Sequence, residues 1–123
     1  MGPKRIKVPL KEWKPTEYMI PQDKLDEIAE HYDGTPESMK DARVVGKPGQ
    51  WYGENGNKRA LFLKTKGHDY IWAWAEDGEE QPDDLEDCRS LAKQAEEHGV
   101  NTLEDLKDKI VSRAEFERKM KRR

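Results

Sequence analysis

The sequence has one cysteine, no long apolar segment and little net charge, and each of these shortages excludes a class of protein. Only 33% of the 123 residues are hydrophobic, and no apolar run approaches the roughly 20 residues of a membrane span. The start, Met1–Arg5, lacks the apolar stretch of a secretory signal. A lone cysteine forms no internal disulfide, which is typical of a reducing cytoplasm. A net charge of −3 gives the chain as a whole no reason to bind nucleic acid.

The remaining composition indicates a folded domain. Charged residues make up 40% of the chain, but the 23 basic and 26 acidic residues nearly cancel, and 4 Trp, 4 Tyr and 2 Phe can fill an interior. We find no internal repeat and no low-complexity linker. Residues 1–123 are therefore predicted to form a single domain, with a core at 4–78 and a helical extension at 83–123.

Apolar periodicity, capping residues and glycine turns predict the elements of the core. Strands are expected at 5–10, 42–46, 50–54 and 69–75, and helices at 23–33, opened by Asp23, and 57–66. Segment 11–21 contains Pro15 and Pro21 and is expected to be a loop. Trp72 and Trp74 share one face of the last strand; we expect them to pack beneath helices, and base stacking is the alternative.

Three patterns typical of capping boxes predict the helices of the extension. Asp83, Thr102 and Ser112 each stand three residues before an acidic residue, and the helices are expected at 83–98, 102–110 and 112–122. This order of elements predicts a mixed α/β fold, with a small mixed sheet, packed helices and a C-terminal helical tail.

A glycine turn connects the strand expected at 50–54 to the helix expected at 57–66. Its sequence at 53–61 is G-E-N-G-N-K-R-A-L. Free N–H groups at a helix N-terminus attract anions, and Asn57 is expected to cap the helix. Lys58 and Arg59 would add charge and a bidentate guanidinium for phosphate oxygens. In the alternative interpretation, Asn55-Gly56 is a common hairpin turn and the two cations are ordinary exposed helix residues.

Several segments together resemble the ParB/sulfiredoxin superfamily. They are I-K-V-P-L-K-E-W-K-P at 6–15, D-K-L-D-E-I-A at 23–29, A-R-V-V at 42–45 and W-Y-G-E-N-G-N-K-R-A-L at 51–61. The family motif is G-E-R-R in ParB, G-C-H-R in sulfiredoxin and D-G-H-H-R in the free-serine kinases. The tail segment G-V-N-T-L-E-D-L at 99–106 is similar to that of small stand-alone ParB-like proteins. The resemblance implies that Gly56, Asn57, Lys58 and Arg59 hold the phosphates of a nucleotide (ATP, ADP or CTP), with Mg2+ bridging them.

Departures from the family motifs narrow the expected activity. Asn57 stands where sulfiredoxin has its cysteine, and Cys88 lies on the apolar face of a predicted helix, so sulfiredoxin activity is not expected. The residues after Gly78 are too few for the DNA-binding and dimerisation modules of partitioning ParB proteins. The serine kinases resemble this chain at Pro15-Thr16-Glu17, which implies a catalytic Glu17. Their second acid is replaced by Asn55, so Glu54 would have to take that role.

The sequence therefore predicts nucleotide binding by a stand-alone ParB-like domain. If the chain is an enzyme, it is expected to be a nucleotide-dependent phosphotransferase or NTPase. The alternative is a non-catalytic module that binds nucleic acid or a protein through its tail, whose end is basic between Arg113 and Arg123 but carries Glu115 and Glu117. His31, His68 and His98 have no zinc-site spacing and are expected at the surface.

Overall fold

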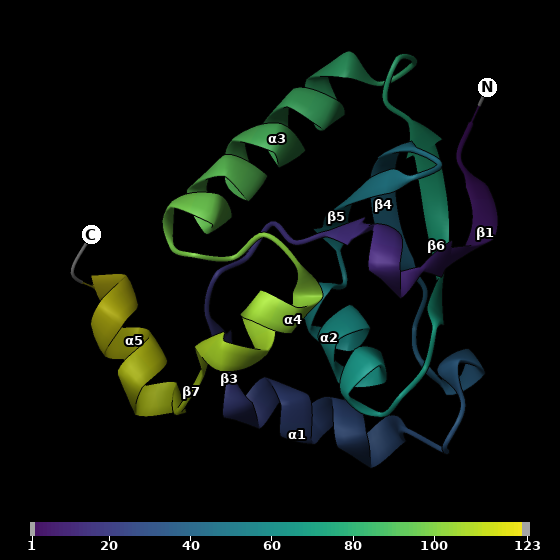
Figure 1. The fold of residues 1–123 in the computed structure, drawn as a ribbon. Helices are drawn as coiled ribbons and strands as arrows, with labels where there is room; N and C mark the ends of the chain where they lie inside the picture. The colour runs from purple at the N-terminus through teal and green to yellow at the C-terminus, as the bar shows by residue number, and fades with distance from the viewer. Residues whose placement is uncertain (1, 122–123) are drawn as a thin grey trace.

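A computed structural model describes residues 2–121, and a five-stranded mixed sheet lies at its centre (Figure 1). The strands are β1 (Lys4–Pro9), β2 (Trp13–Lys14), β4 (Ala42–Lys47), β5 (Gln50–Asn55) and β6 (Tyr70–Asp77), in the order β1-β6-β4-β5-β2. β6 is antiparallel to β1 and parallel to β4, while β5 is antiparallel to β4 and parallel to β2. A second, two-stranded parallel sheet joins β3 (Ile20–Pro21) to β7 (Ile110–Val111).

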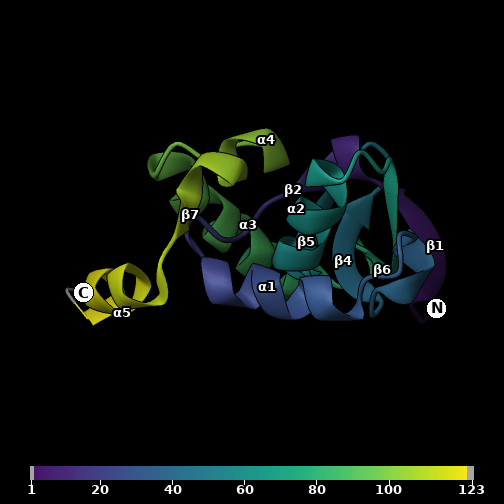
Figure 2. The ribbon, with the colours of Figure 1, turned by 90° about the horizontal axis from the view of Figure 1, so that it is seen from below.

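Helices pack on both sides of the sheet. They are α1 (Gln22–His31), α2 (Asn57–Thr65), α3 (Pro82–Glu97), α4 (Leu103–Leu106) and α5 (Arg113–Lys121). α2 packs against β6, α1 and α4, whereas α3 packs against β4 and β5. α5 projects from one end of the molecule (Figure 2). Among residues 2–121, no helix combines the length and apolarity that crossing a membrane requires.

The main core lies on the α2 side of the sheet. Its fully buried side chains include Val8, Leu61, Leu63 and Ile71, and Leu103 and Leu106 of α4 belong to the same cluster. The expected helical extension is therefore part of the packing that supports α2. A smaller buried group lies between α3 and the sheet, outside that cluster. It includes Cys88 and Ala92 of α3 and Val45 of β4.

The predicted mixed sheet and the two core helices are confirmed, but the proline-rich segment and the tail differ from the prediction. Segment 11–21 holds a 3-10 turn at Leu10–Glu12 and the short strands β2 and β3. The helix expected at 102–110 ends as an α-helix at Leu106, passes through a 3-10 turn and becomes β7. Strands of two residues are too short to show an alternation, so the sequence carries no signal for them.

The predicted caps of three helices had different outcomes. Thr102 forms its capping box with Asp105. Asp23 does not cap α1, because the helix begins after Pro21 and the Asp23 carboxylate binds the Arg113 guanidinium instead. α3 begins after Gln81, without a side-chain cap, so the box expected at Asp83 is absent.

The expectation that Trp72 and Trp74 pack beneath helices is wrong. The buried face of β6 consists of Ile71, Ala73 and Ala75. On the opposite face, Trp74 is 43% exposed and Trp72 is half-buried. Alternation defines the two faces of a strand but not the one that helices cover. Here the helices cover the face with small side chains, which allow close approach, and the indoles lie on the other.

Candidate functional site

Gly56 forms the corner between β5 and α2. Its backbone is left-handed, with φ of 110°, which glycine adopts without strain. A Cβ at this position would lie 2.7 Å from the Cβ of Ala42, so the corner also lacks room for a side chain. Gly56 is itself the N-cap residue of α2, which corrects the expectation that Asn57 caps the helix.

The first turn of α2 presents unpaired backbone donors. The first helical hydrogen bond runs from the Ala60 N–H to the Gly56 carbonyl, at 2.8 Å. No side chain caps the helix, so the N–H groups of Asn57, Lys58 and Arg59 have no intrahelical partner. With the partial positive charge of the helix N-terminus, these groups can bind an anion.

The Asn57 side chain, which is only 2% exposed, is part of the structure of the corner. Its Oδ1 accepts hydrogen bonds from Trp13 Nε1 (3.0 Å) and the Thr16 N–H (3.2 Å), and its Nδ2 donates to Thr16 Oγ1 (2.9 Å). Longer contacts of 3.4 Å reach Glu17 Oε1 and the Gly53 carbonyl. The amide holds segment 13–17 against the corner, and the backbone N–H of Asn57 takes no part in these contacts.

Glu17 and Lys58 are brought together, although they are 41 residues apart. Lys58 Nζ donates to Glu17 Oε2 at 2.9 Å, and both side chains are half-buried. The Glu17 carboxylate is therefore a counter-ion at the corner, and an incoming anion would compete with it for Lys58.

Arg59 turns toward the protein more than a first-turn residue normally does. Its Nη2 donates to the Asp41 carbonyl at 3.4 Å, and its Nε is buried without a hydrogen-bond partner among the described residues. Burial lowers the pKa of the guanidinium, and the charge of Asp41 opposes this effect. A guanidinium with an unused buried donor is available to an anionic ligand.

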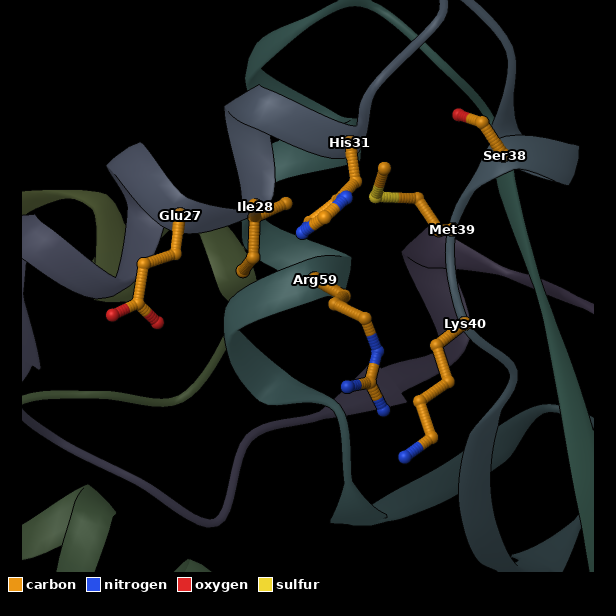
Figure 3. Close-up of a pocket in the computed structure, with 7 residues that line it drawn as sticks. All are labelled: Glu27, Ile28, His31, Ser38, Met39, Lys40 and Arg59. Carbon is orange, nitrogen blue, oxygen red and sulfur yellow. The ribbon is translucent and has the colours of Figure 1, made fainter.

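Two cavities meet at Arg59. The smaller one, of about 270 Å3, covers the corner and is lined by Glu17, Lys24, Glu27, Ile28 and residues 55–59. The larger one, of about 510 Å3, lies between α1 and the segment before β4 (Figure 3). Its lining comprises Glu27, Ile28, His31, Ser38, Met39, Lys40 and Arg59. In Figure 3 the Arg59 guanidinium and the Lys40 ammonium point to the same side of this cavity.

Comparison with solved structures shows what the arrangement resembles. Protein Atu1540 from Agrobacterium tumefaciens matches with a TM-score of 0.52 and 16% identity, over 72% of this chain and 49% of Atu1540. The chain has a ParB/sulfiredoxin-like fold. It spans about half the length of Atu1540. Sulfiredoxin from Arabidopsis thaliana is similar at a TM-score of 0.48 and 18% identity, over 68% of this chain and 98% of that one. No protein-family model and no curated protein matches the sequence.

Glu54 lies apart from the corner of this ParB/sulfiredoxin-like fold. Its side chain points to the opposite face of β5 from that of Asn55, and its carboxylate interacts with Asp84 of α3. Desolvation raises the pKa of the Glu54 carboxyl, Arg43 opposes the shift, and Glu76 adds to it. Cys88 is buried nearby, where burial and these carboxylates raise the pKa of its thiol to about 11. Glu54 lines neither cavity at Arg59, so the structure does not bring it together with Glu17.

The three histidines lie in different parts of the structure, with His31 and His98 exposed, as expected, and His68 half-buried. His31 lines the larger cavity, His68 lies 2.6 Å from the Tyr32 hydroxyl, and His98 stacks on Tyr18 at 3.8 Å. Among residues 2–121, no group of three or more His, Cys, Asp or Glu side chains is arranged to hold a metal ion. In the basic tail, Arg113 pairs with Asp23 and Lys119 with Glu115, while Arg122 and Arg123 lie outside the described residues.

Sequence reasoning missed several residues around Arg59. One face of α1 carries Lys24, Ile28 and His31 at helical spacing. This spacing is the sequence signal that could have grouped them. Met39 and Lys40 reach the larger cavity from an irregular segment, for which local sequence gives no comparable signal.

Proposed function

We propose that the chain binds a nucleotide, with the phosphates at the Gly56 corner and the nucleoside in the larger cavity. The observation that carries this proposal is Arg59, which has an unpartnered buried Nε where the two cavities meet. An anion at this point would satisfy Nε and would also reach the free N–H groups of α2.

The phosphate contacts follow from the corner. The backbone N–H groups of residues 57–59 supply directional donors, and Lys58 and Arg59 supply charge. Lys24 lies on the rim of the same cavity. Asn57 contributes only its N–H group, because its amide is already bonded, and Gly56 contributes the close approach of the backbone.

The larger cavity is suited to a nucleoside. Ile28 and the buried Met39 provide apolar surface for a base, and the His31 ring lies on its wall. Glu27 lines both cavities and can accept hydrogen bonds from ribose hydroxyls. ATP, ADP and CTP all have this combination of groups.

Mg2+ would enter with the nucleotide. Phosphate oxygens and the Glu17 carboxylate suit this ion, which prefers oxygen ligands and keeps several waters. It would neutralise the charge on the phosphates. Glu17 is also the carboxylate placed to accept a proton from an attacking hydroxyl or water. A phosphotransferase or NTPase activity would therefore use Glu17 and not Glu54.

Calorimetric titration with ATP, ADP, CTP and GTP, with and without Mg2+, tests the proposal. Arg59→Ala should lower affinity roughly ten- to a hundredfold, because a charge-assisted hydrogen bond contributes about 1.5–3 kcal/mol. Arg59→Lys should recover only part, since it lacks the planar fork. Arg89→Ala, an exposed arginine of α3, is the matched control. Equal affinities in all four proteins, or no nucleotide binding in the parent, would reject the proposal.

Glu17→Gln separates binding from chemistry. The substitution removes the anion that competes with phosphate for Lys58, so affinity measured without Mg2+ should stay equal or rise by a few fold. Any phosphate transfer or hydrolysis should be lost, which a coupled phosphate-release assay would detect. A variant with full turnover would remove Glu17 from the reaction.

A further inference from the structure

The outer surface of β1 and β6 carries aromatic rings between cations. This surface, here called the aromatic face, consists of Arg5, Lys7, Tyr70, Trp72 and Trp74. Trp74 is 43% exposed, whereas Trp13 and Trp51 are buried in the core. Figure 1 shows β1 and β6 at the edge of the sheet away from α5. An exposed indole on a sheet face marks a binding surface more often than a solitary exposed aliphatic residue does.

Two rings of the aromatic face, Tyr70 and Trp72, are held in fixed orientations. Arg5 lies over the Trp72 ring at 4.2 Å and Lys7 over the Tyr70 ring at 4.5 Å. Tyr70 and Trp72 meet edge to face, with centroids 6.5 Å apart. The Glu37 carboxylate accepts hydrogen bonds from the Tyr70 hydroxyl and from Trp72 Nε1, at 2.5 and 3.1 Å. The surface is therefore organised before any ligand arrives.

A cationic cavity of about 480 Å3 continues the aromatic face beyond Tyr70. Its lining includes Lys7, Lys11, Lys64 and His68, with Asp69 as its one carboxylate. None of these three lysines forms an ion pair within residues 2–121. At the other end of β6, by contrast, Arg5 pairs with Asp41 and Arg43 with Glu76. The three lysines outnumber Asp69 and the nearby Glu37, so positive charge is available at the Tyr70 end, although the whole chain is acidic.

Unpaired cations and an exposed indole on one surface fit one class of ligand. Bases of a single strand stack on aromatic side chains while lysines follow the phosphates. Side chains on one face of a strand recur every two residues, or about 7 Å, so the exposed Trp74 ring lies two such steps from Tyr70, within the span of a few nucleotides. A duplex hides the base faces and could use only the lysines. We propose that the aromatic face and the adjoining lysine cavity bind single-stranded nucleic acid, independently of the nucleotide site.

Fluorescence anisotropy with labelled 12-nucleotide oligo(dT) and oligo(rU) at low salt tests this proposal. Trp74→Ala should weaken binding about five- to a hundredfold through the loss of base stacking. Lys11→Ala should reduce the slope of log affinity against log salt by about 0.7, the value for one single-strand phosphate contact. Leu91→Ala is the matched control, because Leu91 is 47% exposed on α3 and lies outside the surface. Its affinity should equal that of the parent, and melting temperatures should confirm that all variants fold.

Several outcomes would overturn the assignment. They are absence of oligonucleotide binding in the parent, equal affinities for Trp74→Ala and Leu91→Ala, and equally tight binding of a duplex. Displacement of the oligonucleotide by ATP would place it in the Gly56 corner instead. Self-association that Trp74→Ala abolishes, without oligonucleotide binding, would assign the aromatic face to a second copy of the chain.

Discussion

Two polar side chains at the Gly56 corner, those of Asn57 and Arg59, differ in their hydrogen bonding. Asn57 is buried, its Oδ1 accepts hydrogen bonds from Trp13 and Thr16, and its Nδ2 donates one to Thr16. Arg59, by contrast, is half-buried, and its Nε has no hydrogen-bond partner among residues 2–121. The residues are two positions apart in the first turn of one helix.

This difference separates a structural residue from the residue proposed to bind the nucleotide. A fully bonded buried amide fixes the shape of the corner and contributes to stability. A buried donor without a partner costs stability, and a bound ligand is one source of the missing acceptor. Sequence position alone would have given the two residues the same role.

Replacement of Asn57 by alanine should have the largest effect on folding. The substitution leaves the buried donors of Trp13 and Thr16 without an acceptor, and each such group costs about 1–3 kcal/mol. We expect the free energy of unfolding to fall by about 3 kcal/mol in urea denaturation. Asn55→Ala, at the exposed neighbouring asparagine, should change it by less than about 0.5 kcal/mol. Similar losses of stability in both variants would show that the Asn57 amide does not support the fold.

Gly56→Ala should cost more than the same substitution at Gly34. Both glycines have a positive φ, 110° and 99°, so each alanine carries a backbone penalty of about 1–2 kcal/mol. Only at Gly56 does the new Cβ meet a neighbour, Ala42, whereas Gly34 faces open space. We expect Gly56→Ala to lose about 1.5 kcal/mol more stability than Gly34→Ala in thermal or urea unfolding. A difference near zero would show that the corner can widen.

Arg59→Met should stabilise the protein while weakening nucleotide binding. Methionine keeps an apolar stem of similar length and removes the unpaired donor, so the free energy of unfolding should rise by about 1 kcal/mol. Arg89→Met, on the exposed surface of α3, is the control and should leave stability nearly unchanged. A loss of stability in Arg59→Met would show that the guanidinium supports the fold, as Asn57 does.

Glu54→Gln should have the smallest effect, and it depends on pH. Because the folded-state pKa of Glu54 is raised, the folded protein binds a proton more tightly than the unfolded chain. Stability should therefore decrease as pH rises from the ordinary value of 4.5 through the raised pKa. At pH 7 the glutamine variant should be about 0.3 kcal/mol more stable than the parent, and the gain should vanish near pH 4. Glu86→Gln on α3 serves as the control, and nucleotide affinity should not change in either variant.

The parts of the fold that could be predicted have a local signal. β6 alternates clearly, β4 and β5 flank the Pro48-Gly49 turn, and α2 ends before Gly67. The observed bounds of these four elements lie within two residues of the predicted ones. The pairing of Glu17 with the corner was implied by the family resemblance and not by spacing. The mixed sheet and the corner were thus accessible from sequence.

The remaining features depend on contacts between distant segments. Trp13 and Asn57 are 44 residues apart, and nothing near Asn57 shows that its amide will be used for that contact. The exposure of Trp74 depends on where α2 and α3 pack on the sheet. Alternation within β6 does not specify this placement. The burial of Arg59 likewise depends on Asp41, from a loop 18 residues away.

The buried amide of Asn57 limits where a new reactive group can be engineered into this protein. A cysteine at position 57, as in the sulfiredoxin motif G-C-H-R, would remove the acceptor of Trp13 and the donor to Thr16. Such a thiol would be introduced together with a damaged corner, so a lack of reactivity would say little about the chemistry. Asn55 is exposed and lines the same cavity, and its side chain can be replaced without disturbing that network. A designed nucleophile or a spectroscopic label for this site therefore belongs at position 55.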